Sequence, residues 1–276
     1  MPITHTNDVD LFYEDQGTGE PIVLVHGSWD EHTAWHAVAP GLAERFRVIR
    51  YDRRGYGRSG RPPGPRTRRQ DEDDVAGLIE ALDCSPAHVV GSSFGASAAL
   101  ALAARRPELF RSLSLHEPPL IGAASESPPL RPLLAEVLNA ILRAIEQLRA
   151  GDLAGGAKRF VEDVALGPGA WQMLPPEVRE QLIRNAPGFL GDVEDPAAFD
   201  LDLVAAARVG CPLLVTHGSE SPRWLQEVAA FVAGRIDGAQ ARTLAGAGHL
   251  PHETDPEGYR AVVEEFIASA RATISR

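Results

Sequence analysis

The sequence predicts an α/β fold in which a mostly parallel central sheet has helices on both faces and one inserted helical cap. The first observation is Val89–Ala96, where an apolar run enters Gly-Ser-Ser-Phe-Gly and continues into an Ala- and Leu-rich segment. The second is a series of short apolar runs without polar alternation, which is typical of strands covered on both faces. The third is the interval 120–209, which has helical periodicity and no convincing strand. Together they favour one α/β core with an insertion.

Composition limits the class of protein. A chain of 276 residues is long enough to bury a large core. Its formal net charge of −11 argues against nucleic acid or an anionic membrane as partner. Met1–Thr4 carries no basic and apolar leader, and no long uncharged apolar run follows. We therefore expect a soluble cytoplasmic protein that acts on a small molecule. The sequence does not indicate an oligomeric state.

The first part of the core spans residues 1–119. Val9–Glu14 alternates apolar and polar residues as an edge strand does, and Ile22–Val25 is apolar throughout. Further strands are expected at 47–51, 88–92 and 110–115, with helices at 35–45, 71–82 and 96–105. The Pro- and Gly-rich stretch 60–69 predicts irregular surface.

Residues 120–209 are expected to form the helical cap, and residues 210–276 the second part of the core. The cap contains a strongly amphipathic segment at 132–149. Shorter helices are expected at 155–164 and 175–185, separated by glycine-containing breaks that include Gly188. The core resumes with strands at 212–216 and 239–244, helices at 224–234 and 256–275, and a loop at 245–253.

The motif Gly91–Gly95 is expected to place Ser93 on a tight turn between a strand and a helix. Glycine on both sides allows the bend, so the Ser93 hydroxyl projects from the C-terminal edge of the sheet. The amide of Phe94 then faces any molecule that approaches the Ser93 hydroxyl. The alternative is a Gly/Ser turn without chemistry, but an apolar strand before the motif and an Ala/Leu helix after it weigh against that alternative.

A serine nucleophile needs a base within hydrogen-bond reach. The candidate is His249, which lies far downstream between Gly248 and Leu250 in a glycine-rich loop. His252 is the second candidate. A surface or packing role is the alternative for either histidine.

Three separated motifs make the sequence resemble the α/β-hydrolases: His26-Gly27 after a strand, the Gly91–Gly95 pentapeptide, and Gly248-His249 near the C-terminus. The resemblance covers nearly the whole chain except the interval 120–209, whose position resembles the cap of that superfamily. It implies Ser93 as nucleophile and His249 as base.

The resemblance also implies how an oxyanion would be held. Two amide donors are needed, and they correspond to Ser28, after His26-Gly27, and to Phe94. His26 resembles a residue that stabilises its loop by hydrogen bonds to backbone. The stretch Asp52–Ser59 matches a structural signature of the fold, so its Asp and Arg residues are expected to brace loops.

The acid of the triad is where the sequence departs from the commonest family pattern. Many members carry it at the fourth position of a G-x-x-D turn, which here reads Gly218-Ser219-Glu220-Ser221. Other members carry it at the end of the preceding strand, where this chain has Glu117. Glu117 is the preferred candidate to orient His249, and Glu220 is the alternative acid. A third possibility is that Glu117 only anchors the cap hinge through backbone amides.

Trp29, Asp30 and His32 follow the oxyanion loop and are predicted to bind substrate, although Trp29 could equally pack under the loop. We interpret the nine histidines as scattered and not as a metal-ligand set, and no phosphate-binding loop is present, so neither a metal nor a cofactor is expected. Haloalkane dehalogenases and epoxide hydrolases carry aspartate where Ser93 stands, which disfavours both.

The resulting hypothesis is a cofactor-independent bacterial serine hydrolase for a small or medium apolar ester, lactone or related acyl compound. Three alternatives use the same triad: carbon–carbon bond hydrolysis, perhydrolysis and cofactor-free oxygenation. A non-catalytic small-molecule receptor is a further alternative, because one fold hosts many functions.

Overall fold

A computed structural model describes residues 2–207 and 209–274, and it contains an eight-stranded sheet with the order β1-β2-β4-β3-β5-β6-β7-β8. The strands are β1 (Ile3–Thr6), β2 (Val9–Gln16), β3 (Pro21–Val25), β4 (Arg47–Tyr51), β5 (Ala87–Ser92), β6 (Phe110–His116), β7 (Leu213–Gly218) and β8 (Gln240–Leu244). The pairs β1–β2 and β2–β4 are antiparallel, and every other pair is parallel. The mostly parallel α/β fold is confirmed.

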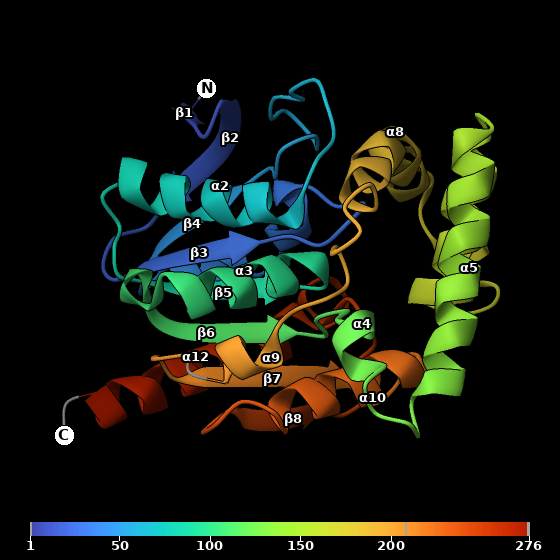
Figure 1. Cartoon of the computed structure of the whole chain (residues 1–276). Helices are drawn as coiled ribbons and strands as arrows, with labels where there is room; N and C mark the ends of the chain where they lie inside the picture. The colour runs from blue at the N-terminus through green and yellow to red at the C-terminus, as the bar shows by residue number, and fades with distance from the viewer. Residues whose placement is uncertain (1, 208, 275–276) are drawn as a thin grey trace.

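Helices cover both faces of this sheet because each buried strand sends alternate side chains to opposite sides. In β3, Val23 and Val25 join the core beneath α2 (Arg68–Ala81), α3 (Phe94–Arg105) and α10 (Arg223–Ala233). Ile22 and Leu24 join the core beneath α1 (Ala39–Ala43) and α12 (Pro256–Ile274). Figure 1 shows α2, α3 and α10 in front of the sheet and α12 behind it.

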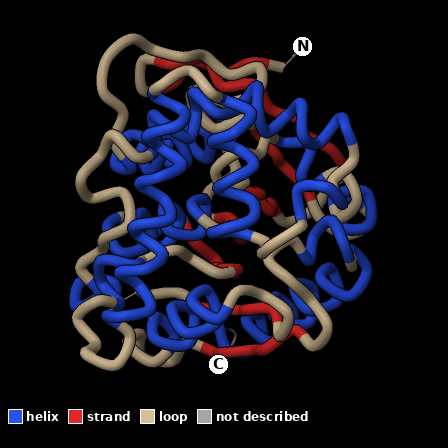
Figure 2. The backbone as a smooth tube through the Cα atoms, turned by 90° about the vertical axis from the view of Figure 1, so that its right-hand side faces the viewer, coloured by secondary structure: helices blue, strands red, loops and turns tan. Residues whose placement is uncertain are grey.

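Between β6 and β7 the described part of the chain is helical. It forms α4 (Ile121–Ala124), α5 (Arg131–Arg149), α6 (Leu153–Phe160), a π-helical turn (Val161–Ala165), α7 (Ala170–Met173), α8 (Pro176–Asp192) and α9 (Leu203–Ala206). The arrowheads of the parallel strands point toward α5 and α8 in Figure 1, and Figure 2 shows these helices in front of the strand ends. The carboxyl edge of the sheet therefore lies beneath this helical segment between β6 and β7, which we call the insertion.

Several local predictions were wrong in instructive ways. β1 was missed, so the strand predicted at the edge, β2, is the second strand of the sheet. The helix predicted at 35–45 is instead a 3₁₀ turn, His32–Trp35, followed by the short α1. Part of the loop predicted at 245–253 is helical, as α11 (Pro251–Thr254). The last helix was predicted to end at Ser275, which lies outside the described residues.

Helix α8 runs through the predicted break at Gly188. Tyr56 explains why a small residue is needed there: a Cβ added to Gly188 would lie 2.6 Å from the Tyr56 ring. The glycine marks a close contact between the insertion and the core, and tertiary packing outweighs the low helix propensity of Pro187 and Gly188.

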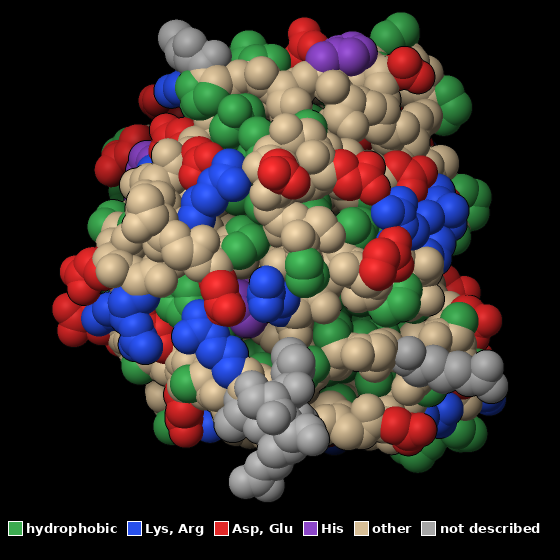
Figure 3. Space-filling view, turned by 90° about the vertical axis from the view of Figure 1, so that its left-hand side faces the viewer, with side chains coloured by type: hydrophobic (Ala, Val, Ile, Leu, Met, Phe, Trp, Pro, Cys, Tyr) green, Lys and Arg blue, Asp and Glu red, His purple; other side chains and the backbone are tan. Residues whose placement is uncertain are grey.

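None of the helices that the structure describes has both the length and the apolar character needed to cross a membrane. Figure 3 shows the face opposite α5, where acidic and basic side chains are interspersed. The negative net charge is therefore not gathered into one acidic field on that face.

Candidate active site

Ser93 lies on the turn between β5 and α3 with φ +50° and ψ −123°. Non-glycine residues rarely adopt such a conformation, and they keep it only where the surroundings impose it. Here the Ser93 amide donates to the His116 carbonyl at 2.9 Å. Gly95 lets α3 start close to β3, because an added Cβ would lie 2.4 Å from the His26 carbonyl oxygen. The predicted strand-turn-helix geometry is present.

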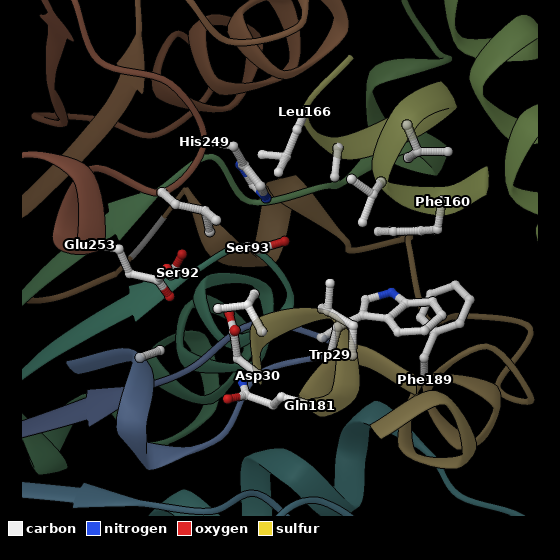
Figure 4. A pocket seen from close by; sticks show the side chains of 18 of the residues that line it. Trp29, Asp30, Ser92, Ser93, Phe160, Leu166, Gln181, Phe189, His249 and Glu253 are labelled. Carbon is white, nitrogen blue, oxygen red and sulfur yellow. The ribbon is translucent and has the colours of Figure 1, made fainter. Parts of the chain in front are cut away.

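Ser93 and His249 line one cavity of about 350 Å³ beneath the insertion. Ser93 follows β5 and His249 lies on the loop after β8, so two segments far apart in the sequence meet at this cavity. Figure 4 shows the Ser93 hydroxyl and the His249 ring on this cavity. Within residues 2–207 and 209–274 the hydroxyl makes no hydrogen bond, so it can rotate toward the ring or toward a ligand.

Glu117 follows β6 and binds the other side of the same imidazole. The His249 Nδ1 atom lies 2.5 Å from Glu117 Oε2, and Glu117 Oε1 accepts from the Gly218 amide at 2.8 Å. Glu117 is fully buried and has φ +48°. Burial alone would raise the pKa of this carboxyl, but its hydrogen bond and charge interaction with His249 outweigh burial and lower the pKa to about 2. Glu117 is therefore ionised at neutral pH.

An ionised Glu117 can only accept a hydrogen bond, so Nδ1 of His249 carries the hydrogen and donates it in this contact. That tautomer leaves the lone pair on Nε2 of His249, the nitrogen that a base uses. The alternative acid, Glu220, is exposed, and its carboxylate contacts the Ser219 hydroxyl at 3.3 Å. Of the two candidate acids the structure brings Glu117, and not Glu220, to His249.

The loop after β3 lies directly against the nucleophile turn. A Cβ added to Gly27 would lie 3.0 Å from the Cβ of Ser93. Ser28 follows Gly27 and lines the cavity, and its hydroxyl donates to Asp192 Oδ2 at 2.7 Å. Phe94 opens α3, and the first amides of a helix have no partner within the helix. The two residues predicted to hold an oxyanion therefore flank Ser93.

Residues 22–262 match the model of the Alpha/beta hydrolase family. The chain belongs to this family. A 2-hydroxymuconate semialdehyde hydrolase from Pseudomonas sp. (strain CF600) is 30% identical over 267 residues, covering 94% of this chain and 90% of the relative.

Solved structures agree with this assignment. A thermophilic esterase from Thermogutta terrifontis is 27% identical, with a TM-score of 0.78 over 95% of this chain and 94% of the esterase. The enol-lactonase from Burkholderia xenovorans LB400 has a TM-score of 0.77 over 97% of this chain and 100% of its own. At 24% identity the lactonase supports the fold alone. The family to which this chain belongs and the hydrolases among its relatives identify this α/β-hydrolase as an enzyme.

A buried ion network that sequence reasoning missed joins the insertion of this α/β-hydrolase to its core. Asp192, in α8, binds Arg53 at 2.9 Å, Arg66 at 3.0 Å and the Tyr56 hydroxyl at 2.5 Å. Burial would raise the pKa of Asp192, but the two guanidinium groups outweigh burial and lower the pKa. Because Asp192 also accepts from Ser28, the network fixes the loop beside Ser93. Arg53 braces loops, as predicted. Its partner Asp192 lies 139 residues away along the chain, so no pattern of neighbouring residues could indicate the pair.

Of the three predicted substrate-binding residues, the structure brings Trp29 and Asp30 to the cavity, but not His32. The Trp29 ring stacks on Phe189 with centroids 4.5 Å apart. His32 is buried, with 3% of its surface exposed, and its Nδ1 atom lies 2.7 Å from Asp52 Oδ1. The interaction with Asp52 gives His32 a bracing position in place of the expected pocket position.

Two further predicted histidines occupy buried positions. His26 donates from Nδ1 to the Gly27 carbonyl at 2.7 Å and accepts at Nε2 from the Arg53 amide at 2.9 Å. Its predicted backbone contacts are confirmed. His252 is fully buried and is not among the described residues that line the cavity, so its position does not fit the second candidate base.

Three groups of histidine and carboxylate side chains in the described part of the chain place potential metal ligands within 4.8 Å of one another: His116, Glu117 and His249; Glu14, His32 and His36; and Asp30, His252 and Glu253. His32 and His36 in the second group have the H-x-x-x-H spacing, so the interpretation that the histidines lack metal-ligand spacing was wrong there. In every group one ligand comes from a segment distant in sequence, which residue spacing could not indicate. In the first group the Glu117–His249 pair is already formed, and in the second His32 is held by Asp52. The absence of a metal stays a prediction.

Proposed function

We propose that this α/β-hydrolase is a cofactor-independent serine hydrolase that cleaves a small or medium apolar ester, lactone or related acyl compound through an acyl-enzyme. The observation that carries the proposal is the 2.5 Å contact between His249 and the buried Glu117, on the cavity that Ser93 also lines. A histidine oriented by an ionised acid beside a serine on a strained turn is the arrangement that nucleophilic acyl transfer requires.

In this mechanism Ser93 Oγ attacks the carbonyl carbon while His249 Nε2 takes the hydroxyl proton. Glu117 holds the ring and stabilises the imidazolium that forms. The amides of Ser28 and Phe94 donate to the oxyanion of the tetrahedral intermediate. His249 then gives its proton to the departing alcohol, and a water activated by the same ring cleaves the acyl-enzyme, which releases the acid and regenerates Ser93.

We further propose that residues 120–209 act as a cap that shapes the substrate site. Phe160 and Phe189 come from this segment and line the cavity together with Trp29. Their ring centroids lie 4.8 Å apart, so they form one continuous aromatic wall suited to an apolar acyl or alkyl group. A cytoplasmic location stays part of the proposal.

Carbon–carbon bond hydrolysis is the second candidate function. It is favoured by the 30% identity to a 2-hydroxymuconate semialdehyde hydrolase over nearly the full length of both chains. A 2-hydroxymuconate semialdehyde contains no ester bond, so its hydrolysis must break another bond. The same Ser93 and His249 would serve either reaction.

A substrate panel tests the proposal. p-Nitrophenyl esters of graded acyl length, γ- and δ-lactones and 2-hydroxymuconate semialdehyde are offered to the wild type and to Ser93→Ala. We expect ester or lactone turnover with a burst of one alcohol per enzyme, and a fall in kcat/KM of about 10³-fold or more in Ser93→Ala. Turnover of the semialdehyde alone would favour the second candidate. Ester turnover that survives in Ser93→Ala would contradict both.

A further inference from the structure

The cavity of this α/β-hydrolase has two unlike sides. Figure 4 shows the rings of Trp29, Phe160 and Phe189 on one side and polar groups on the other. The polar side comprises Asp30 from the loop after β3, Ser92 from the end of β5, Gln181 from α8 and Glu253 from α11. The proposed reaction uses Ser93 and His249 and does not account for the polar side.

Two carboxyl groups dominate the polar side. Oxygen atoms of Asp30 and Glu253 and a ring nitrogen of His252 all lie within 4.8 Å of one another. Among the residues that the structure describes, neither carboxyl forms an ion pair with Lys or Arg. Burial and then the charge of Glu253 hold the pKa of Asp30 well above its ordinary value. Two carboxyl groups this close to each other disfavour the ionised form of the pair, and a cation bound beside them would stabilise that form.

Two buried polar side chains beside the acidic pair lack hydrogen-bond partners, and the one that lines the cavity, Ser92, gives an independent indication that a ligand belongs here. His252 lies behind the lining; it is fully buried, and neither ring nitrogen has a hydrogen-bond partner in the described part of the chain. Burial lowers the pKa of His252 to about 3, so the ring is neutral and cannot balance the acidic pair. The Ser92 hydroxyl, 1% exposed and lining the cavity, also has no partner among the described residues. Buried polar groups without partners are uncommon and costly.

Resting on the proposed function, we propose that Asp30 and Glu253 form a subsite that binds a protonated amine carried by the substrate, while the substrate's apolar part lies against Trp29 and Phe160. The acidic pair supplies a charge with no cationic partner among the described residues, and an ammonium group would supply that cation together with N–H donors. An organic cation fits this position better than a free ion does, because the pair opens onto the cavity that Ser93 lines.

Isosteric esters test the subsite directly. In the first pair, 2-(dimethylamino)ethyl butyrate is compared with 3-methylbutyl butyrate, so a protonated nitrogen replaces a CH group in the alcohol. In the second pair, ethyl 4-(dimethylamino)butyrate is compared with ethyl 5-methylhexanoate, which moves the same exchange into the acyl chain. We expect kcat/KM to favour the amine by about tenfold or more in at least one pair.

Glu253→Gln removes the charge of the exposed member of the pair and retains its shape, and Asp30→Asn does so at the half-buried member. Each variant is expected to reduce the amine preference at least fivefold. The matched control is Glu257→Gln, an exposed carboxylate on the following helix outside the cavity lining, which should retain the wild-type preference. Glu253→Gln suffices if Asp30→Asn does not fold, because Glu253 lies at the exposed edge of the cavity.

A binding measurement separates the subsite from the catalytic proposal. Calorimetry on Ser93→Ala, with 2-(dimethylamino)ethanol and 4-(dimethylamino)butyrate against 3-methylbutanol and 5-methylhexanoate, should show tighter binding of at least one amine and loss of that advantage in Ser93→Ala combined with Glu253→Gln. Equal binding within both pairs, or a preference that Glu253→Gln leaves intact, would overturn the subsite even if the neutral esters are hydrolysed. Selective amine binding by a protein that hydrolyses no ester would support the subsite and refute the proposed function.

Discussion

Glu117 at the carboxyl edge of the sheet and Asp192 in the insertion are both buried carboxylates, but the regions around them compensate the charge differently. Glu117 binds one histidine, whose ring can gain and lose a proton. Asp192 binds two arginines, whose charge is permanent, together with a tyrosine and a serine hydroxyl. The first region suits a change of protonation during a reaction, whereas the second suits a fixed contact between the insertion and the core.

This difference explains how the site is assembled. The reacting groups stand on the sheet edge, where three strand ends and their loops meet beneath the insertion. The Asp192 network then ties α8 to the loop that carries Ser28. Substitutions in the two regions should therefore have different signatures, with loss of turnover at Glu117 and loss of folding stability at Asp192.

The largest difference is expected between Glu117 and Glu220. Glu117→Gln should lower kcat/KM for the best ester about 10³-fold or more, because the amide cannot stabilise the imidazolium and no longer fixes the tautomer of His249. Glu220→Gln should remain within about twofold of the wild type, because Glu220 is exposed and does not contact His249. Steady-state kinetics on both variants decide the question. A loss confined to Glu220→Gln would assign the acid to the turn after β7.

A smaller effect on turnover and a larger one on stability are expected for Asp192→Asn. Arg53 and Arg66 share two buried carboxylates, Asp192 and Asp71. The substitution removes one of them and leaves one buried positive charge uncompensated, which typically costs about 3–5 kcal/mol in the free energy of unfolding. Denaturant unfolding of Asp192→Asn measures this loss. The control is the nearby exposed carboxylate in Glu194→Gln, which should change the free energy of unfolding by less than about 0.5 kcal/mol. Equal stability of the two variants would show that the network does not hold the insertion to the core.

The parts of the molecule that the sequence predicted well are those with a strong local pattern. The apolar runs of β3, β4 and β5 and the turn at Ser93 were located to within a residue or two, because burial on both faces and flanking glycines leave a signature in adjacent residues. His249 was identified by its Gly-His step and Glu117 by its place at a strand end.

The rest depends on contacts between segments far apart in sequence. Asp192 carries no motif, and only the folded chain places it beside Arg53 and Arg66. Glu253 likewise reaches Asp30 from the opposite end of the chain. His32 was misplaced because its partner, Asp52, lies on another loop. Such positions are set by tertiary packing, on which residue spacing gives no information.

Labelling with a fluorophosphonate probe tests the central claim, that Ser93 is a nucleophile activated by His249 and Glu117. The folded wild type should take up one probe per chain, with the modified peptide mapping to Ser93. Ser93→Ala should remain unlabelled, and Glu117→Gln should react more slowly than the wild type. Absence of the label from Ser93 in folded wild-type protein, or attachment to a different residue, would contradict the claim.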